Sequence, residues 1–468
     1  MLKKYLLILF CCIFSLELYA QVPEPSGRRL RNIAEVQFPD KSIVIGATTG
    51  SWAFGTNTGL IMDREFGYVT PENDFKQAVI HPDPTTWKWD RSDAWLQHII
   101  DNNQILRMHC PVSPQCSDWA KGDSRTPEEL ETNMREFFKA VCQRYNGKPG
   151  FEYMDVVNET VVQGVWHTNK PGTNWECPWY KIGQDNDKNN TPLYIKYAFE
   201  IAQQYAPDIK FIYNQHDSDP ASWELIKETI DYLRNKGLRV DGIGWQAHVD
   251  NGFANAENMN HLRNLIDWAH NNDLEFHITE ASVWLKDGNS QTALEEQADT
   301  YKAILEVLLE KHFTGKVAWN IWHIDDGHGW HTEWYPSLFD NNYMAKPAYY
   351  AIQDALENAV PSSVSESIYQ KSLNVENSKL EQNNPNPFNP QTTISYQLPV
   401  FSKVTLKIYD TKGQEVQTLE NENKSAGNHS VVWNGKDHSG QQLSSGVYFY
   451  SLELDNDFSE TKQMLLLK

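Results

Sequence analysis

The stretch Tyr153-Met-Asp-Val-Val-Asn-Glu-Thr160 is an apolar, strand-prone run that ends abruptly in a carboxylate, Glu159. The later stretch Phe276-His-Ile-Thr-Glu280 has the same character and also ends in a glutamate. A carboxylate at the mouth of a buried strand is costly unless the site requires it. Because parallel strands present their carboxyl ends at one edge of a sheet, the two stretches predict a pair of acids that face one cleft.

Short apolar runs recur on both sides of these stretches and alternate with helical patterns. The pattern over Pro127–Tyr145 has clear start signals, since Thr126 is a capping residue and acids follow in the first turn. Such alternation over residues 21–358 predicts an α/β fold, a (β/α)₈ TIM barrel. An open doubly wound sheet is the alternative, which the absence of a glycine-rich phosphate loop after the first strand disfavours. The expected strands are Ile43–Ala47, Tyr68–Thr70, Ile105–Met108, Tyr153–Val157, Lys210–Tyr213, Gly242–Gln246, Glu275–Ile278 and Lys316–Ile321.

Both ends of the chain differ from the barrel region. Residues 1–20 combine basic Lys3 and Lys4 with an apolar run and a small residue at the expected cleavage point, which predicts a signal peptide. The apolar run is too short to cross a membrane, so we expect export without stable membrane insertion. Residues 359–383 are polar and aperiodic and predict a linker. Residues 384–468 contain short strands separated by turn signals and predict a small all-β sandwich.

The composition narrows the range of partners. The formal net charge is −21 at pH 7, so the acidic surface disfavours nucleic acid and anionic lipid. Trp (17), Tyr (21) and Phe (19) are abundant, which suits a sugar-binding cleft because a pyranose ring has apolar faces, although most aromatic side chains serve the core. We expect a monomeric protein that acts on a neutral polysaccharide.

Four cysteines remain after removal of the predicted signal peptide: Cys110, Cys116, Cys142 and Cys177. An exported protein permits disulfides, and three pairings are open. Cys110 and Cys116 are close enough in sequence to staple one loop, whereas Cys142 lies in a helical pattern as a buried thiol. No cysteine–histidine spacing resembles a zinc site, so we expect neither a metal nor a cofactor.

Two carboxylates that face one cleft are the equipment for breaking a glycosidic bond with retention of configuration. That reaction uses one carboxyl that is protonated at rest and one that is ionised, about 5–5.5 Å apart across the scissile bond. We assign Glu159 as the acid/base and Glu280 as the nucleophile, with Asn158 as a partner for a sugar hydroxyl. The alternative for each glutamate taken alone is an ordinary acid at a strand end.

These motifs and their order resemble glycoside hydrolase family 10, the endo-β-1,4-xylanase barrels, over roughly residues 40–357. Asp155-Val-Val-Asn-Glu159 is similar to the acid/base motif of that family, and Ile278-Thr-Glu280 to its nucleophile strand. The resemblance implies that His248 hydrogen-bonds the nucleophile and keeps it ionised. It also implies a substrate-binding set: Glu72, Asn73, Lys76, His109, Asn158, Gln246, His248, Trp322 and Trp330.

The chain departs from the family pattern at two places. Ser113 and Pro114 stand where the family usually has Trp-His, and Ser282 stands where it has Asp. Trp119 is a candidate replacement for the missing aromatic platform. These changes keep three interpretations open: hydrolysis of xylan, the same chemistry on another β-linked glycan or a substituted xylan, and a surface barrel that binds polysaccharide without cleaving it.

Two loops contain further candidate residues. Trp166, Trp175 and Trp179 either form stacking platforms on the leaving-group side of the substrate or pack their own loop. The loop after the eighth strand concentrates polar side chains, which we interpret as a subsite wall rather than a metal site because retaining glycosidases need no metal. These side chains are His323, Asp325, Asp326, His328 and His331.

Three motifs in the C-terminal region, Asn384-Pro-Asn-Pro-Phe388, Ile408-Tyr-Asp410 and Ser445-Gly-Val-Tyr448, resemble the C-terminal sorting domain of the type IX secretion system. The resemblance implies contact with that secretion machinery. It also implies passage through the periplasm to the outside, or to the outer cell surface, of a Gram-negative bacterium. A retained spacer or sugar-binding domain is the alternative for residues 384–468.

Overall fold

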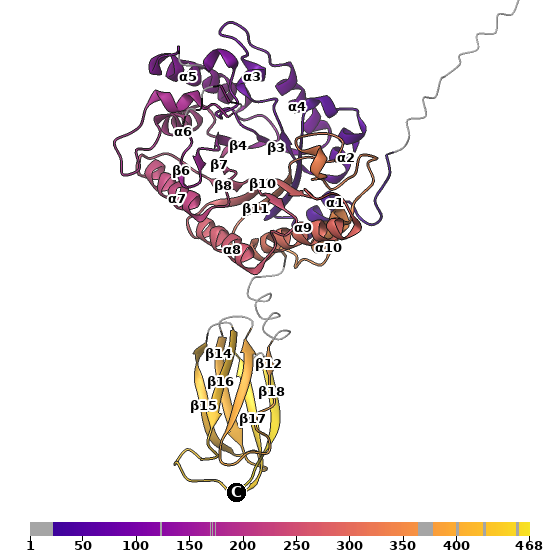
Figure 1. Cartoon of the computed structure of the whole chain (residues 1–468), viewed down its shortest axis with the longest axis vertical. Helices are drawn as coiled ribbons and strands as arrows, with labels where there is room; N and C mark the ends of the chain where they lie inside the picture. Colours follow the sequence, from indigo (N-terminus) through magenta and orange to yellow (C-terminus); the bar gives the residue numbers. More distant parts are fainter. Residues whose placement is uncertain are drawn as a thin grey trace, which may run out of the picture. The chain divides into compact units, whose positions relative to one another are not determined.

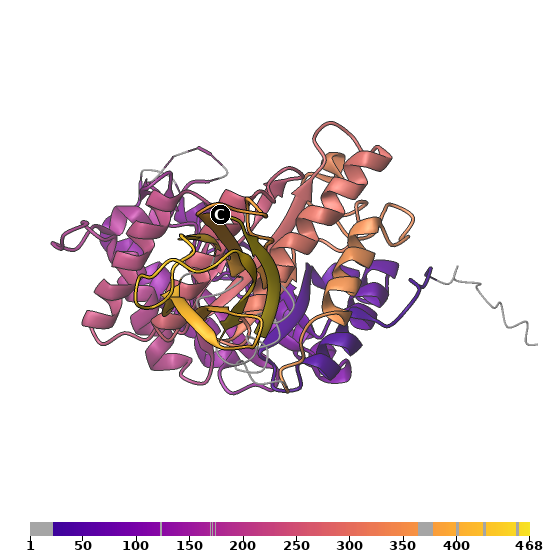
Figure 2. The ribbon, with the colours of Figure 1, turned by 90° about the horizontal axis from the view of Figure 1, so that it is seen from below.

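The computed structural model describes residues 22–121, 124–168, 170, 172–173, 175–363, 378–398, 402–424, 427–454 and 458–468. The chain divides into two compact units, Met1–Ser362 and Ser363–Lys468. Helices surround the strands of the first unit, and the second unit is built from strands (Figure 1; Figure 2). The predicted signal peptide, residues 1–20, and residues 364–377 of the predicted linker lie outside the described part of the chain.

The first unit is a closed barrel of parallel strands. Its strands pair in the order β11-β1-β2-β3-β4-β7-β8-β10, and a parallel pairing of β10 with β11 closes the ring. This closure confirms the predicted TIM barrel and excludes the open doubly wound sheet. The strands are β1 (Ile43–Thr49), β2 (Tyr68–Pro71), β3 (Ile105–Met108), β4 (Phe151–Asn158), β7 (Lys210–Gln215), β8 (Gly242–Trp245), β10 (Glu275–Trp284) and β11 (Val317–Ile321).

Helices cover the outside of this barrel (Figure 1). The start of α5 shows how the sequence specifies them: Thr126 and Glu129 cap each other's backbone N–H groups, and Pro127 occupies the first helical position. The apolar faces of the helices and strands form one buried core between the two layers. The helices are α1 (Leu30–Gln37), α2 (Asn57–Glu65), α3 (Gln77–Ile80), α4 (Asp90–Asp101), α5 (Pro127–Tyr145), α6 (Leu193–Tyr205), α7 (Pro220–Asn235), α8 (Ala256–Asn271), α9 (Gln291–Lys311) and α10 (Pro347–Glu357).

Strand β10 extends beyond the residue at which the sequence predicts its end. It continues past Ile278 to Trp284, and its added part pairs in parallel with a short strand, β9 (His248–Asp250). The polar residues that follow Ile278 interrupt the apolar run and therefore conceal the extension in the sequence. As a result Glu280 lies within a strand, and the pairing aligns Ser282 with His248.

The second unit is a sandwich of two antiparallel sheets, as predicted. One sheet has the order β12-β13-β16 and the other β15-β14-β17-β18, around a buried core that includes Tyr396, Leu406 and Trp433. The sequence did not predict β12, β15 and β18, which all lie at sheet edges; β15 is largely polar, as an edge strand can be. The strands are β12 (Lys379–Leu380), β13 (Thr392–Leu398), β14 (Ser402–Tyr409), β15 (Glu415–Lys424), β16 (Gly427–Trp433), β17 (Gly446–Leu454) and β18 (Phe458–Leu466).

The four cysteines after the predicted signal peptide are all buried, free thiols. None of the three open pairings is therefore formed, the Cys110–Cys116 staple included. The Sγ atom of Cys110 lies 3.5 Å from His109 Nε2, whereas Cys116 packs into the core between strands and helices. Cys142 is a buried thiol in α5, as predicted.

Within the described part of the chain, no helix combines the length and the apolar character that crossing a membrane requires.

Candidate active site

One cavity at the carboxyl ends of the barrel strands collects the predicted site residues. Its volume is about 570 Å³. Trp175, one of the candidate platforms, also lines it, together with Gln115, His216 and Trp284, which the sequence did not single out. The predicted residues in its lining are Glu72, Asn73, Lys76, His109, Asn158, Glu159, Gln246, His248, Glu280, Trp322 and Trp330.

Glu280 is buried among groups that favour its ionised form. Asn214 Nδ2 donates to one carboxylate oxygen over 2.9 Å, and His248 Nε2 lies 3.3 Å from the other. Burial favours the neutral acid, but the positive charges of His109, His248 and Arg107 and the hydrogen bond from His248 outweigh it and lower the pKa of Glu280 to about 2. The expected contact between His248 and Glu280 is thus present.

His109 supplies positive charge beside this carboxylate. Its Nδ1 atom lies 2.7 Å from Asp155 Oδ2 and 3.9 Å from Glu280 Oε1. Burial disfavours the imidazolium, but the neighbouring Cys110, Glu280 and Asp155 raise the pKa of His109 to about 10. Asp155 also forms a buried ion pair with Arg107, so these charges are compensated within the barrel.

Glu159 occupies a different local environment. It follows β4 with a positive φ of 56°, a backbone conformation that is uncommon for residues other than glycine. Its N–H group donates to Asn214 O over 3.2 Å. Its carboxylate accepts a hydrogen bond of 2.9 Å from Gln246 Nε2. The strained turn therefore directs a partly exposed carboxyl group into the cavity.

A chain of amide side chains connects the two glutamates. Gln246 Nε2, which binds Glu159, also lies 3.2 Å from Asn158 Oδ1. Asn214 Nδ2 donates to Asn158 Oδ1 over 2.8 Å as well as to Glu280. Sequence reasoning missed Asn214, although its position at the end of a barrel strand was a usable signal.

The loop of residues 110–116, which departs from the family pattern, contributes Gln115 to the cavity. Lys76 Nζ donates to Asn73 Oδ1 over 2.9 Å and also to Gln115 Oε1, so Gln115 turns into the cavity. Ser113 is buried, and its carbonyl oxygen accepts from Trp179 Nε1 over 3.0 Å. Trp179 thus packs this loop and is not a stacking platform.

The missing platform is not replaced by Trp119. That side chain donates from Nε1 to His81 O over 3.2 Å and does not belong to the cavity lining among the described residues. Trp166 likewise donates to a backbone carbonyl of its own loop, that of Asn189, over 2.8 Å. Of the three tryptophans after β4, Trp175 lines the cavity.

An aromatic wall borders Glu280. The ring of Trp284 stacks on His248 with 5.7 Å between centroids, and Trp330 meets both rings edge to face. Trp322 meets His109 edge to face at 5.1 Å. Sequence reasoning missed Trp284, because it lies on the part of β10 that was not predicted.

The polar residues after β11 bind protein groups. His323 Nε2 accepts a hydrogen bond of 3.0 Å from the Trp330 backbone, and burial lowers the pKa of His323 to about 3, so its ring is neutral. Asp326 pairs with Lys346 at 2.9 Å, and Asp325 Oδ1 lies 2.8 Å from His328 Nδ1. The described residues contain no cluster of three or more His, Cys, Asp or Glu that could hold a metal ion.

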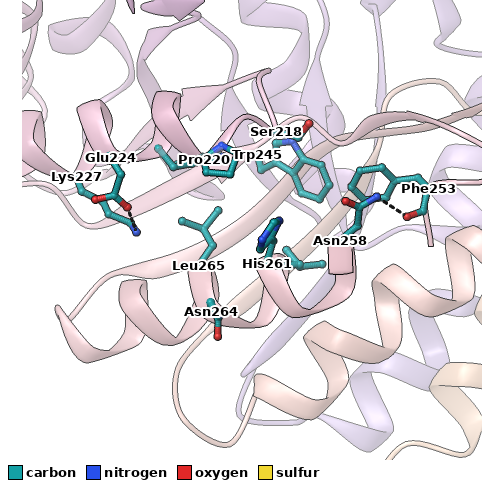
Figure 3. Close-up of a pocket in the computed structure, with 12 residues that line it drawn as sticks. Ser218, Pro220, Glu224, Lys227, Trp245, Phe253, Asn258, His261, Asn264 and Leu265 are labelled. Atoms are coloured by element: carbon teal, nitrogen blue, oxygen red, sulfur yellow. Dashed lines mark hydrogen bonds and ion pairs between the residues drawn. The ribbon is translucent and has the colours of Figure 1, made fainter. Parts of the chain in front are cut away.

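A second cavity lies between α7 and α8 on the outside of the barrel (Figure 3). It has a volume of about 230 Å³, and Trp223, Trp245 and Phe253 contribute to its wall. Glu224 is the one acidic residue among the described residues that line it, and its carboxylate pairs with Lys227 at 2.8 Å. Without a second acid this cavity lacks the equipment for acid/base work, so the cavity with both glutamates is the candidate active site.

Comparison with known families divides the chain in the same way as the fold. A family model described as glycosyl hydrolase family 10 matches residues 33–355. A second model, described as the FlgD Ig-like domain, matches residues 386–457.

Similar proteins and structures match the barrel unit. Endo-1,4-beta-xylanase B of Thermotoga neapolitana is 29% identical over 307 residues, which cover 64% of this chain and 82% of that protein. Endo-1,4-beta-xylanase A of Caldicellulosiruptor saccharolyticus is 30% identical over 315 residues, with coverage of 62% and 87%. The crystal structure of xylanase 10B from Thermotoga petrophila RKU-1 in complex with xylobiose is similar with a TM-score of 0.61 and 28% identity, over 72% of this chain and 99% of that one.

Proposed function

Because the chain belongs to glycosyl hydrolase family 10, we propose that it is an exported endo-β-1,4-xylanase that cleaves internal bonds of xylan with retention of configuration. The xylanases that share its barrel support this substrate class. The observation that carries the proposal is the single cavity that contains both Glu159 and Glu280.

In the first step, Glu280 attacks the anomeric carbon while Glu159 gives its proton to the departing glycosidic oxygen. A bond forms between the carboxylate and the sugar as the glycosidic bond breaks, and the departing chain leaves with a new hydroxyl group. Asn214 and His248 hold the two oxygens of Glu280, so the nucleophile is oriented before the sugar binds.

In the second step, the ionised Glu159 takes a proton from a water molecule, whose oxygen attacks the anomeric carbon and releases Glu280. Two displacements at one carbon restore the original configuration. Gln246 contacts both Glu159 and Asn158, which supports a role in fixing the position of the acid/base relative to the sugar-binding amide.

Proton NMR of the anomeric signal during xylan digestion tests the proposal directly. We expect the first product to carry the β configuration and to reach the anomeric equilibrium later. A first product of α configuration would overturn the retaining mechanism. Absence of any released sugar would favour a barrel that binds without cleaving, and a panel of β-linked glycans and substituted xylans would identify a different substrate.

Export rests on separate observations and needs its own test. We infer that residues 1–20 direct the chain to the periplasm and that the C-terminal sandwich engages a type IX secretion system, so that a monomeric enzyme reaches the cell exterior. In a bacterium with that system, the full chain should appear in the culture fluid or at the outer surface. A chain that ends at Ser362, the last residue of the barrel unit, should remain inside the cell envelope with its activity intact, whereas equal export of both chains would refute the sorting role.

A further inference from the structure

An exposed tryptophan lies in the loop after β1, a strand whose loop contributes none of the described residues that line the cavity. Trp52 belongs to the loop after β1, and 46% of its surface is exposed. Strand β1 pairs with β11 on one side and with β2 on the other. The loops after both neighbours line the cavity, through Trp330 and through Glu72 and its neighbours. The topology therefore places the loop of Trp52 between two walls of the cleft.

Two hydrogen bonds tie this loop to the wall formed after β2. The Glu72 N–H group donates to Thr49 O over 3.0 Å. The Ser51 N–H group donates over 2.7 Å to Asp74 Oδ2, a carboxylate that is fully buried. The residues that flank Trp52 are thus held against the segment that contains Glu72 and Asn73.

The other wall holds the indole ring itself. The ring of Trp52 packs on that of His328, with centroids 5.1 Å apart and an angle of 34° between the planes. His328 is fixed in turn by Asp325, whose second oxygen accepts a hydrogen bond of 2.7 Å from Thr58 of α2. One face of the indole is therefore supported, while much of the side chain stays open to solvent.

A large apolar ring that is both held in place and exposed is suited to bind a ligand with an apolar face. The polysaccharide that occupies the cavity has such faces, because the C–H bonds of a pyranose lie on the two sides of its ring. The acidic net charge of the chain, −21, does not oppose a neutral ligand.

We propose that Trp52, backed by His328, is a stacking platform for an additional sugar unit of the polysaccharide, beyond the units that contact Glu72, Asn73 and Lys76. The inference rests on the proposed function, since it extends the same cleft. Trp52 would then make the affinity depend on the length of the substrate, because a long oligosaccharide reaches the platform and a short one does not.

Calorimetric titration with xylo-oligosaccharides from xylobiose to xylohexaose tests this inference. The Glu280→Ala background prevents turnover, and Trp52→Ala is added to it. We expect affinity for the longer oligosaccharides to fall about tenfold, the effect of losing one stacked apolar face, while affinity for the shortest is unchanged. Trp52→Tyr, which keeps an aromatic ring, should retain part of the affinity.

Trp87→Ala is the matched control. Trp87 is also exposed, at 38%, but stacks on His81 and lies outside the described cavity lining. This variant should bind every oligosaccharide like its parent. Equal affinities of the Trp52→Ala variant and its parent at every length would overturn the inference, as would an equal loss at every length. Failure of the proposed function is recognised separately: if the substrate is another glycan, the Glu280→Ala parent would bind none of the oligosaccharides, and if the barrel binds without cleaving, the chain with Glu280 intact would release no sugar from xylan.

Discussion

The surroundings of Glu280 and Glu159 differ more than their sequence contexts suggest. Glu280 is only 3% exposed and lies among His109, His248 and Arg107, which together favour a negative charge. Glu159 is partly exposed, and its carboxylate accepts from the neutral amide of Gln246. Two glutamates of similar local sequence are thus placed in unlike electrostatic environments.

This difference matches the division of work in a retaining hydrolysis. A nucleophile must be ionised whenever the sugar arrives, and nearby positive charge keeps it so. An acid/base must release and regain a proton in every turnover, and a neutral amide accommodates both forms. The contrast therefore supports Glu280 as the nucleophile and Glu159 as the acid/base, and substitutions at these and neighbouring residues can test it.

Removal of Glu280, the proposed nucleophile, should have the largest effect. Glu280→Ala is expected to lower kcat on xylan by at least about 10⁴-fold, because no covalent intermediate forms. Azide, entering the space of the lost carboxylate, should restore part of the rate and yield a glycosyl azide of inverted configuration. Ser282→Ala is a suitable control, since that hydroxyl contacts the backbone carbonyl of Glu280 at 3.4 Å and not its carboxylate. Full activity of Glu280→Ala would exclude this assignment.

Removal of Glu159, the proposed acid, should have an effect that depends on the leaving group. Glu159→Gln is expected to lower kcat/KM on xylan by about 10²–10⁴-fold, the usual contribution of general acid catalysis. Aryl xylosides with an activated leaving group need no proton and should lose far less in the glycosylation step. The comparison of the two substrate types is the measurement, and equal losses on both would refute the acid role.

Substitution of Asn214 tests whether the amide side chains that connect the surroundings of Glu280 and Glu159 are needed for activity. Asn214→Ala removes a hydrogen bond to Glu280 and another to Asn158. Since a hydrogen bond to a charged group contributes about 1.5–3 kcal/mol, we expect kcat to fall roughly 10–100-fold with a smaller change in KM. Asn214→Asp, of the same shape but negatively charged, should be the more damaging change. A kcat of Asn214→Ala close to that of the wild type would show that the amide chain is not needed.

His109 tests the electrostatic side of the comparison and should give the smallest effect at neutral pH. His109→Asn removes a positive charge while burial of Glu280 persists, so the pKa of Glu280 should rise from about 2. Glu280 is active only above its pKa, and the acidic limb of the kcat/KM profile should therefore move to higher pH. His216→Asn is the matched control, because His216 lines the same cavity but packs on Trp175, at 5.2 Å between rings. A profile of His109→Asn that coincides with that of the wild type would contradict the charge argument.

Much of the barrel and the candidate site could be predicted from the sequence. The eight strands and the helix Pro127–Tyr145 are found where the patterns indicated them, and the residues that the family resemblance implied line one cavity. The reason is that local periodicity and capping chemistry specify each element, and that a parallel barrel gathers its strand ends at one mouth.

The predictions failed where a residue is defined by its neighbours in space. Gln115 faces Lys76, Trp284 stacks on His248, and Cys110 lies beside His109 instead of bonding to Cys116. No local pattern announces such contacts. The edge strand β15 was missed for a related reason, since its pairing with β14 and not its own composition makes it a strand.

The sequence by itself determined that this chain forms a barrel with two glutamates that follow apolar, strand-prone runs, because those features follow from short-range patterns. Only the tertiary structure decided that Glu280 lies among positive charges and Glu159 beside a neutral amide. The groups responsible are far apart along the chain, and electrostatic energy depends on their distances in space rather than on their order in the sequence.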